Sequence, residues 1–415
     1  MEKNHKMTSE KHTRQTLDAT RQDFDIVISG GGLSGCLTAL SLCDFKNPNG
    51  SLLSIAIIEN NKISQGCSLS FGDRVLALSH GTAAYFAELG VWGFLQRDAQ
   101  PIEKIHISDR GHYGKARLDA KNNQVAALGY VVEMSLIGQA LLQALTIKKN
   151  ITWLTPDSID TVVWQQSHVD MSLNSGALLS TKLLLGCDGA NSPCRSFANI
   201  ESTQTSYGQS ALITNVSTEI MHQNIAYERF TETGPIAMLP LSKKRCSLVW
   251  TLTPQLAEKM LLLDDTDFKV ALEQAFGSWL GAITKVGKRD VYPLNLVQAK
   301  TQIYHRMALV GNASHTIHPI AGQGFNLGVR DVQQLAQLIK TAKLNGEDIG
   351  NFSLLSQYQQ QRSTDQQQVI TFTDSLVTLF SNQLPPLVIG RSIGLKVLNY
   401  LSPLKKVLVK KTMGH

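Results

Sequence analysis

Three glycines near the start of the chain have the spacing of a phosphate-binding turn. Gly30, Gly32 and Gly35 follow a β-branched run and precede a helix-compatible stretch. In such a turn the first glycine permits a tight bend, the second lets the backbone approach a pyrophosphate, and the third lets the helix pack on the strand. Glu59 closes the next apolar run, where a carboxylate hydrogen-bonds an adenosine ribose. The pattern predicts a dinucleotide site for either NAD or FAD, and the alternative is a plain structural turn.

A second glycine-rich segment, residues 311–326, favours FAD. It contains a strand end, a proline loop and the start of a helix. Free backbone N–H groups and the positive end of the helix dipole then point at one spot, which suits the anion of a reduced flavin. The alternative is an ordinary glycine-rich helix start. The predicted cofactor-binding residues of this segment are Asn312, Gly322, Gln323, Gly324 and Asn326, with the loop at His318 and Pro319 in front of the flavin.

These motifs, in this order, resemble the class A flavoprotein aromatic hydroxylases. The DG element of that family matches Asp188 and Gly189, and Arg74 falls where the family places a cofactor-contacting arginine. The family's GD aspartate is replaced by Asn312, whose amide oxygen still accepts a hydrogen bond from the ribityl chain. The resemblance runs from about Phe24 to the C-terminus. The blocks 108–112, 228–230, 237–240 and 311–331 look most like the ubiquinone-biosynthesis branch.

The resemblance implies an enzyme that uses FAD, NAD(P)H as a transient electron donor, and O2 to hydroxylate a polyprenylated phenol. An asparagine at position 312 resembles the subgroup that hydroxylates C4 of a 2-octaprenyl-6-methoxyphenol. The flavin carries the chemistry, so no side chain is named as catalytic. Three alternatives stay open: hydroxylation at another ring position, an FAD-dependent prenyl-lipid reductase, and a non-catalytic flavin-binding subunit of a quinone-synthesis complex. A flavin halogenase is disfavoured, because no two tryptophans lie two residues apart.

Other reactive side chains have a structural interpretation. His315 and His318 are expected to be hydrogen-bonded loop residues rather than proton-transfer groups. Cys187 and Cys194 flank the DG element without a pairing base and are expected to be packing residues. The six cysteines contain no C-x-x-C pair and no histidine at zinc-finger spacing, so the sequence predicts neither a disulfide framework nor a metal site.

The elements that must position these residues predict an α/β fold. Apolar runs at Phe24–Ile28, Ile55–Ile58 and Met307–Val310 are typical of a Rossmann-like FAD-binding sheet. Alternating apolar and polar residues over about 205–295 predict an inserted antiparallel substrate sheet. The predicted division is a disordered leader at 1–23, a discontinuous FAD-binding domain at 24–200 and 296–345, a substrate domain at 201–295, and a basic amphipathic helical segment at 346–415.

Composition excludes several classes of protein. Of the 415 residues 43% are hydrophobic and 17% charged, which rules out disorder for the bulk of the chain. The net charge of +6 is concentrated after Ser375, where no acidic residue occurs, so a nucleic-acid partner is not expected. The leader lacks a signal-peptide core, and no apolar run spans a bilayer. We expect a cytoplasmic protein whose tail contacts the inner face of the cytoplasmic membrane, caps the core or docks to a partner. The tail cations are Arg391, Lys396, Lys405, Lys406, Lys410 and Lys411.

Overall fold

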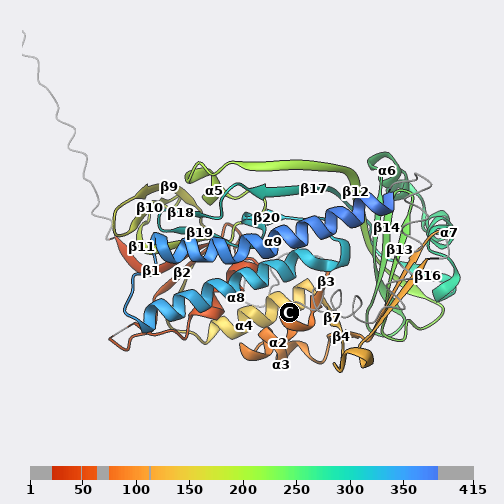
Figure 1. Ribbon diagram of the computed structural model, residues 1–415, viewed down its shortest axis with the longest axis horizontal. Coiled ribbons are helices and arrows are strands. Elements are labelled where there is room, and N and C mark those ends of the chain that lie inside the picture. The colour runs from red at the N-terminus through yellow and green to blue at the C-terminus, as the bar shows by residue number, and fades with distance from the viewer. Residues whose placement is uncertain (1–20, 48, 63–73, 112–113, 382–415) are drawn as a thin grey trace, which may run out of the picture.

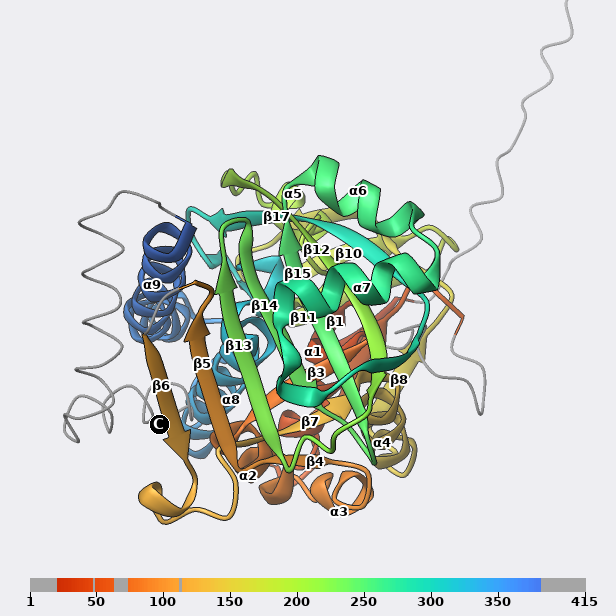
Figure 2. The same ribbon diagram turned by 90° about the vertical axis from the view of Figure 1, so that its right-hand side faces the viewer.

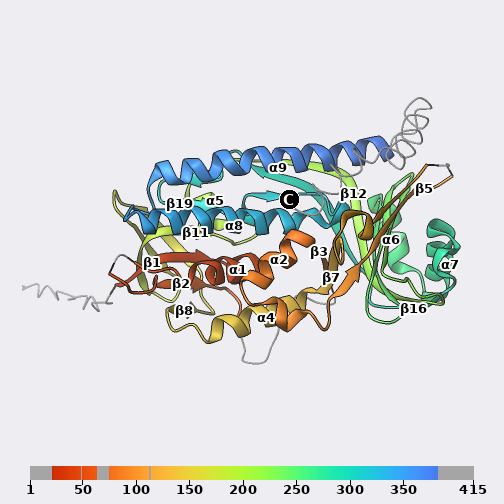
Figure 3. The same cartoon turned by 60° about the horizontal axis from the view of Figure 1, so that its bottom comes forward.

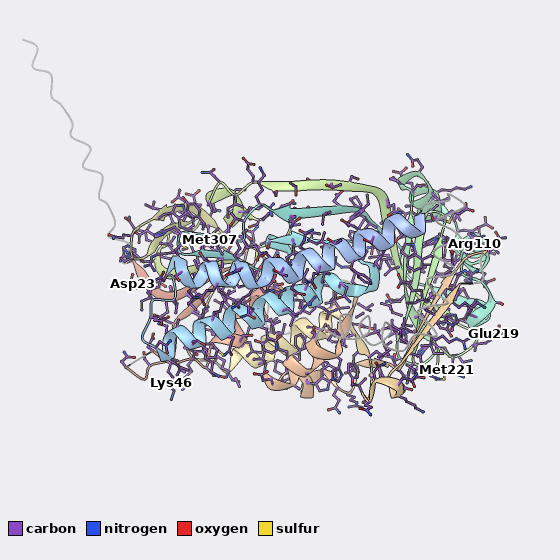
Figure 4. All side chains as sticks on the ribbon, viewed as in Figure 1. Asp23, Lys46, Arg110, Glu219, Met221 and Met307 are labelled. Atoms are coloured by element: carbon purple, nitrogen blue, oxygen red, sulfur yellow. The ribbon has the colours of Figure 1, made fainter. Side chains whose placement is uncertain are left out.

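The computed structural model describes residues 21–47, 49–62, 74–111 and 114–381. Two large sheets stand at opposite ends of an elongated molecule (Figure 1). Met307 marks the end that holds the parallel strands, and Glu219 and Met221 mark the other end (Figure 4). Long strands and two long helices connect the two ends.

The first sheet has five parallel strands at its centre. Its strands are buried on both faces, which explains why they read as continuous apolar runs. Ile26 and Ile28 of β1 (Gln22–Ser29) pack toward one core cluster, and Val27 packs toward another on the opposite face. An antiparallel hairpin, β9 (Ile159–Trp164) and β10 (Val169–Leu173), extends β11 (Leu178–Gly186). The spatial order is β18 (Ile303–Tyr304), β19 (Met307–Leu309), β11 (Leu178–Gly186), β1 (Gln22–Ser29), β2 (Ile55–Ile58) and β8 (Ile151–Leu154), with β18 antiparallel at the edge.

Helices on one face of this sheet carry the glycine-rich motifs. Helix α1 (Leu33–Leu42) contacts both α4 (Met134–Thr146) and α8 (Gln323–Leu344). Helix α9 (Phe352–Ser381) runs beside α8 toward the second sheet (Figure 3). A small sheet, β3 (Val75–Ser79), β7 (Gly129–Glu133) and β4 (Gln100–Ile102), lies between the two large ones, next to α2 (His80–Glu88) and α3 (Trp92–Leu95).

The second sheet has nine strands, and β13, β14 and β15 lie side by side within it (Figure 2). Helices α6 (Pro254–Leu262) and α7 (Asp265–Phe276) cover its outer face, where Trp250 packs against Phe268. The spatial order is β20 (His315–Thr316), β17 (Asp290–Ala299), β12 (Ser202–Thr218), β15 (Arg245–Leu252), β14 (Gly234–Pro240), β13 (Ile225–Thr231), β5 (Lys104–Asp109) and β6 (Lys115–Asp119), while β16 (Ile283–Val286) pairs with β12.

The sheets cross the predicted segment boundaries at two places. Strands β5 and β6 fall within the predicted FAD-binding segment but extend the antiparallel sheet, because β5 pairs in parallel with β13, more than one hundred residues later. Strand β1 begins at Gln22, inside the predicted leader, and residues 1–20 lie outside the described residues. Helix α9 is described as far as Ser381, and the cations of the basic tail lie outside the described residues. The domain boundaries themselves stay a prediction.

Within the described ranges, no helix combines the length and the apolar character needed to cross a membrane.

Candidate functional site

A cavity of about 710 Å³ lies where the parallel strands end and the inner face of the antiparallel sheet begins. The turn after β1 contributes Gly32, and the turn after β19 contributes Asn312. Helix α8 begins at the cavity, and strands β5, β13, β14 and β15 form the far wall. Ligands of parallel α/β sheets bind at the carboxyl ends of the strands, so this placement is that of a cofactor site.

The three motif glycines of the first turn differ in their surroundings. At two of them a side chain would clash with neighbouring atoms, and the third borders open space. A Cβ on Gly30 would lie 2.5 Å from the carbonyl oxygen of Cys187, and the Gly30 φ of +99° also favours glycine. A Cβ on Gly35 would lie 1.8 Å from the Gly30 oxygen. By contrast, no described atom lies within 4 Å of a Cβ on Gly32. Gly30 and Gly35 hold the turn against the fold, and Gly32 leaves room beside the backbone.

Helix α1 starts at this turn as an open anion site. Gly32 is its N-cap, and no described side chain caps the helix. The first intrahelical bond runs from the Cys36 N–H to the Gly32 oxygen, so the preceding amides have the unpaired donors of any helix start. Together with the dipole, these donors fit a pyrophosphate. The room beside Gly32 and the amide donors at the start of α1 therefore fit the diphosphate of FAD.

Glu59 ties the end of β2 to the glycine turn. Its Oε2 accepts from the Gly31 N–H at 2.8 Å, and its Oε1 accepts from the Asn61 N–H at 2.9 Å and from Asn61 Nδ2 at 3.0 Å. A carboxylate has about four acceptor positions, so one position remains for a ribose hydroxyl. Glu59 is not among the residues that line the cavity, and its contact with the ribose stays a prediction.

The second glycine segment brings another helix start to the same cavity. Gly322, with a φ of +61°, is the N-cap of α8, and no side chain in the described ranges caps it. Gly322, Gln323 and Gly324 line the cavity beside Asn312 and Pro319. A Cβ on Gly328 would lie 3.2 Å from the Gly311 Cα, so α8 passes close to the turn after β19. Two helix N-termini thus face one cavity, as the sequence predicted.

Asn326 lines the cavity, but its side-chain amide forms its hydrogen bonds with protein atoms. Its Oδ1 accepts from the Ser79 N–H and the Thr82 hydroxyl, both at 2.8 Å. Its Nδ2 donates to the carbonyl oxygens of Ala77 and Gly322 at 2.8 and 2.7 Å. These four bonds fix the start of α8 to β3, so the side-chain amide positions the helix, and its expected contact with the cofactor stays a prediction.

The DG element supplies an unpaired buried acceptor. Asp188 Oδ2 accepts from the Cys194 N–H at 2.9 Å, while Oδ1 is buried without a hydrogen-bond partner among the described residues. Burial raises the pKa of this carboxyl. Gly189 and Arg74 line the cavity, and the Arg74 guanidinium lies 5.6 Å from the centre of the Tyr292 ring. The free Asp188 oxygen fits a hydroxyl of a bound cofactor.

Both histidines of the 315–318 loop are buried. His315 Nε2 lies 2.8 Å from Asp331 Oδ2, and the Asp331 carboxylate also accepts from Arg362 Nε at 2.7 Å. Burial opposes ionisation of Asp331, but His315 and Arg362 hold its pKa at about 2. Burial lowers the pKa of His318 to about 4, so the ring is neutral near pH 7, and its Nδ1 accepts from the Ile320 N–H. Pro319 lines the cavity, whereas His318 is not among its lining residues.

One cavity residue, Glu228 on β13, was missed by the sequence analysis as a site residue. Its carboxyl lies among apolar side chains, and burial raises its pKa to about 7. The sequence signal was the alternation over 226–230, which places Ala226, Glu228 and Phe230 on one face of a strand. That alternation could not say which face meets a cavity.

Comparison with known proteins agrees with this geometry. A family model described as FAD binding domain matches residues 23–373. The chain is 33% identical over 395 residues to "Ubiquinone hydroxylase UbiL" of Rhodospirillum rubrum, covering 94% of this chain and 89% of that protein. It is 31% identical over 397 residues to "3-demethoxyubiquinol 3-hydroxylase" of Escherichia coli (strain K12), covering 95% and 100%. The crystal structure of p-nitrophenol 4-monooxygenase PnpA from Pseudomonas putida DLL-E4 superposes with a TM-score of 0.77 at 17% identity, covering 95% and 99%, and shows the same fold.

Proposed function

Because the chain belongs to the family of FAD-dependent aromatic monooxygenases that contains the ubiquinone hydroxylases, we propose that it hydroxylates a polyprenylated phenol of ubiquinone biosynthesis. FAD is the cofactor, and NAD(P)H and O2 are the co-substrates of this family. The finer proposal is hydroxylation at C4 of 2-octaprenyl-6-methoxyphenol, the reaction of 2-octaprenyl-6-methoxyphenol hydroxylase.

The observation that carries the proposal is the two-sided character of the cavity. One side consists of backbone amides at two helix starts, with Asn312 beside them. The other side is a sheet face of aliphatic side chains, including Ile105, Ile107 and Leu239. The polar side suits a flavin, and the apolar side suits an aromatic ring that carries a hydrocarbon chain.

The residues divide the work between holding the cofactor and excluding water. When bound, FAD would supply the activation of O2 and the oxygen transferred to the ring. The amides at Gly32 and Gly324 would hold the anionic parts of the cofactor, and Glu59 would accept from its ribose. Arg74, just before β3, and Asp188 and Gly189, just after β11, would contact the cofactor. The aliphatic wall keeps water from the ring.

Asn312, at the edge of the cavity, supports the C4 proposal. It replaces the aspartate of the wider family, and an asparagine at this position resembles the C4-hydroxylating subgroup. Hydroxylation at another ring position is the second candidate, and one observation favours it. The E. coli relative, 31% identical, is named for hydroxylation at position 3. The reaction type and the ring position that is hydroxylated therefore need separate tests.

A kinetic experiment tests the reaction type. We expect the purified protein to contain FAD and to oxidise NAD(P)H faster, with matching O2 uptake, when a 2-prenyl-6-methoxyphenol is added. A prenyl-lipid reductase would consume NAD(P)H without substrate-linked O2 uptake. A flavin-binding subunit without catalysis would show no stimulation by the phenol.

The finer partner and location proposals rest on the chemistry of the substrate. A polyprenylated phenol is nearly insoluble in water, so the enzyme meets it at a bilayer or in a complex of quinone-synthesis proteins. We propose that the basic tail, the acid-free segment 375–415, provides peripheral contact with the inner face of the cytoplasmic membrane. Its sequence combines Lys and Arg with apolar residues, the two signals that lasting attachment needs.

A further inference from the structure

The apolar wall of the cavity contains one acidic side chain within a row of residues that pair across neighbouring strands. Five neighbouring strands place one residue each on this row, and the register pairs them in sequence. All five line the cavity: Ile107, Glu228, Ala237, Val249 and Ile213. Glu228 stands between Ile107 and the small Ala237, so its carboxyl has room to meet a ligand on that wall.

Glu228 has no hydrogen bond or ion pair with any residue that the structure describes. It also carries the only carboxylate among the described lining residues, and Arg74 is the only other ionised side chain there. Burial is the one cause of its raised pKa, so no neighbouring charge compensates for its position. A half-buried carboxyl on an apolar wall has lost part of its hydration, and a ligand that offers a donor would restore a hydrogen bond.

The charged groups around Glu228 leave it electrically isolated. Strand alternation turns Tyr227 and Arg229 of β13, and Lys104 and His106 of β5, to the outer face, where His106 stacks on Tyr227. Strand β14 has no titratable residue. On the cavity side of the neighbouring elements, the remaining titratable groups are Asp109 at the end of β5, Arg74, Cys187 and, on α9, Asp374, which accepts from the Tyr207 hydroxyl.

We propose that Glu228 is a catalytic residue that accepts the hydroxyl proton of the bound phenol. This inference rests on the proposed function and names the group that activates its substrate. The phenol O–H bond breaks, a carboxyl O–H bond forms on Glu228, and the negative charge passes to the phenol oxygen. That charge spreads to the ortho and para carbons of the ring, which become more reactive toward an electrophilic oxygen. A positioned base of this kind contributes about 10²-fold or more to a rate.

Ligand binding to the wild-type holoenzyme tests the inference first. The probes are a 2-methoxyphenol with a short prenyl chain and its O-methyl ether, titrated while the absorbance of the bound flavin is followed. Above a pH of about 7 Glu228 is a carboxylate that accepts from the phenol, and below that pH it is protonated. Binding of the phenol should tighten as the pH rises through about 7, and binding of the ether, which has no proton to give, should not. The same pH dependence for both ligands would overturn the inference.

Glu228→Gln keeps the shape of the side chain and removes its ionisation. We expect this variant to retain FAD and its reduction by NAD(P)H, to lose the pH dependence of phenol binding, and to hydroxylate about 10²-fold more slowly. The matched control is Glu232→Gln, an exposed acid in the turn that follows β13, which should leave both measurements unchanged.

The outcomes separate this inference from the proposed function. If wild-type enzyme hydroxylates the phenol but Glu228→Gln keeps the rate and the pH profile, the inference fails and the function stands. If the wild type binds the phenol with the predicted pH dependence but never hydroxylates it, the function fails and Glu228 remains the ligand contact. Should the variant lose its flavin, the wild-type comparison of phenol and ether still decides.

Discussion

At the scale of single residues, Gly32 is the one among the three motif glycines, Gly30, Gly32 and Gly35, whose replacement we expect to leave the fold intact. Its Cβ would enter space free of described atoms, so Gly32→Val should fold and fill the place of the pyrophosphate. We expect a purified variant with wild-type secondary structure and little or no FAD. Gly35→Ala is the contrasting variant, because its Cβ would overlap the Gly30 oxygen and should lower the thermal stability itself. A yellow Gly32→Val protein with full flavin content would contradict the assignment of the turn.

Asn312 sets the charge at the edge of the cavity. Asn312→Asp would place an anion beside a cofactor that becomes negative on reduction, and like charges disfavour the reduced state. At an effective dielectric constant of about 20, two like charges about 8 Å apart repel by about 2 kcal/mol, which corresponds to about 40 mV for a two-electron couple. We expect a lower flavin midpoint potential and slower reduction by NAD(P)H. An unchanged or higher potential in a dye-equilibrated titration would refute this electrostatic argument.

At the scale of elements, a buried ion cluster joins α8 to α9. Asp331 is fully buried and accepts from Arg362 and from Gln366 Nε2, both on α9, and from the Gly311 N–H. Asp331→Asn removes the fully buried partner of Arg362 and leaves that guanidinium only its ion pair with the half-buried Asp365. We therefore expect about 3 kcal/mol lower stability, the lower end of the range for a broken buried pair, in denaturant unfolding of the holoenzyme. Asp170→Asn, which breaks the exposed pair with Arg21, should cost less than about 1 kcal/mol. Equal losses in the two variants would show that the cluster does not hold the helices together.

The predictable parts of the molecule are the ones encoded locally. The glycine turns, the acid after β2 and the buried strand runs lie within short segments, and the structure places them as expected. The pairing of β5 with β13 joins residues far apart in sequence, and no local alternation specifies it. The same limit hid Glu228, because only the assembled sheet shows that its face meets the cavity. Asn326 lines the cavity, but its four bonds to protein atoms depend on how β3 meets α8, which the local sequence does not specify.

At the scale of the whole molecule, the two sheets share one cavity, and the basic tail is the proposed route to a membrane. Each cation near an anionic leaflet contributes about 1 kcal/mol. We therefore expect salt-sensitive co-sedimentation with anionic vesicles, weakened when Lys405, Lys406, Lys410 and Lys411 are all changed to Gln while FAD content stays normal. Equal binding of both proteins at low and high salt would leave a core cap or a partner subunit as the role of the tail.

The central claim is that this cavity directs one oxygen atom from O2 onto the ring of a prenylated phenol. The most direct measurement is mass and NMR analysis of the product formed from a short-chain 2-prenyl-6-methoxyphenol, NAD(P)H and isotopically labelled O2. We predict a product with a single labelled hydroxyl at C4 of the ring. A labelled hydroxyl at another carbon would contradict the C4 proposal alone, whereas a product without labelled oxygen would contradict the hydroxylase account itself.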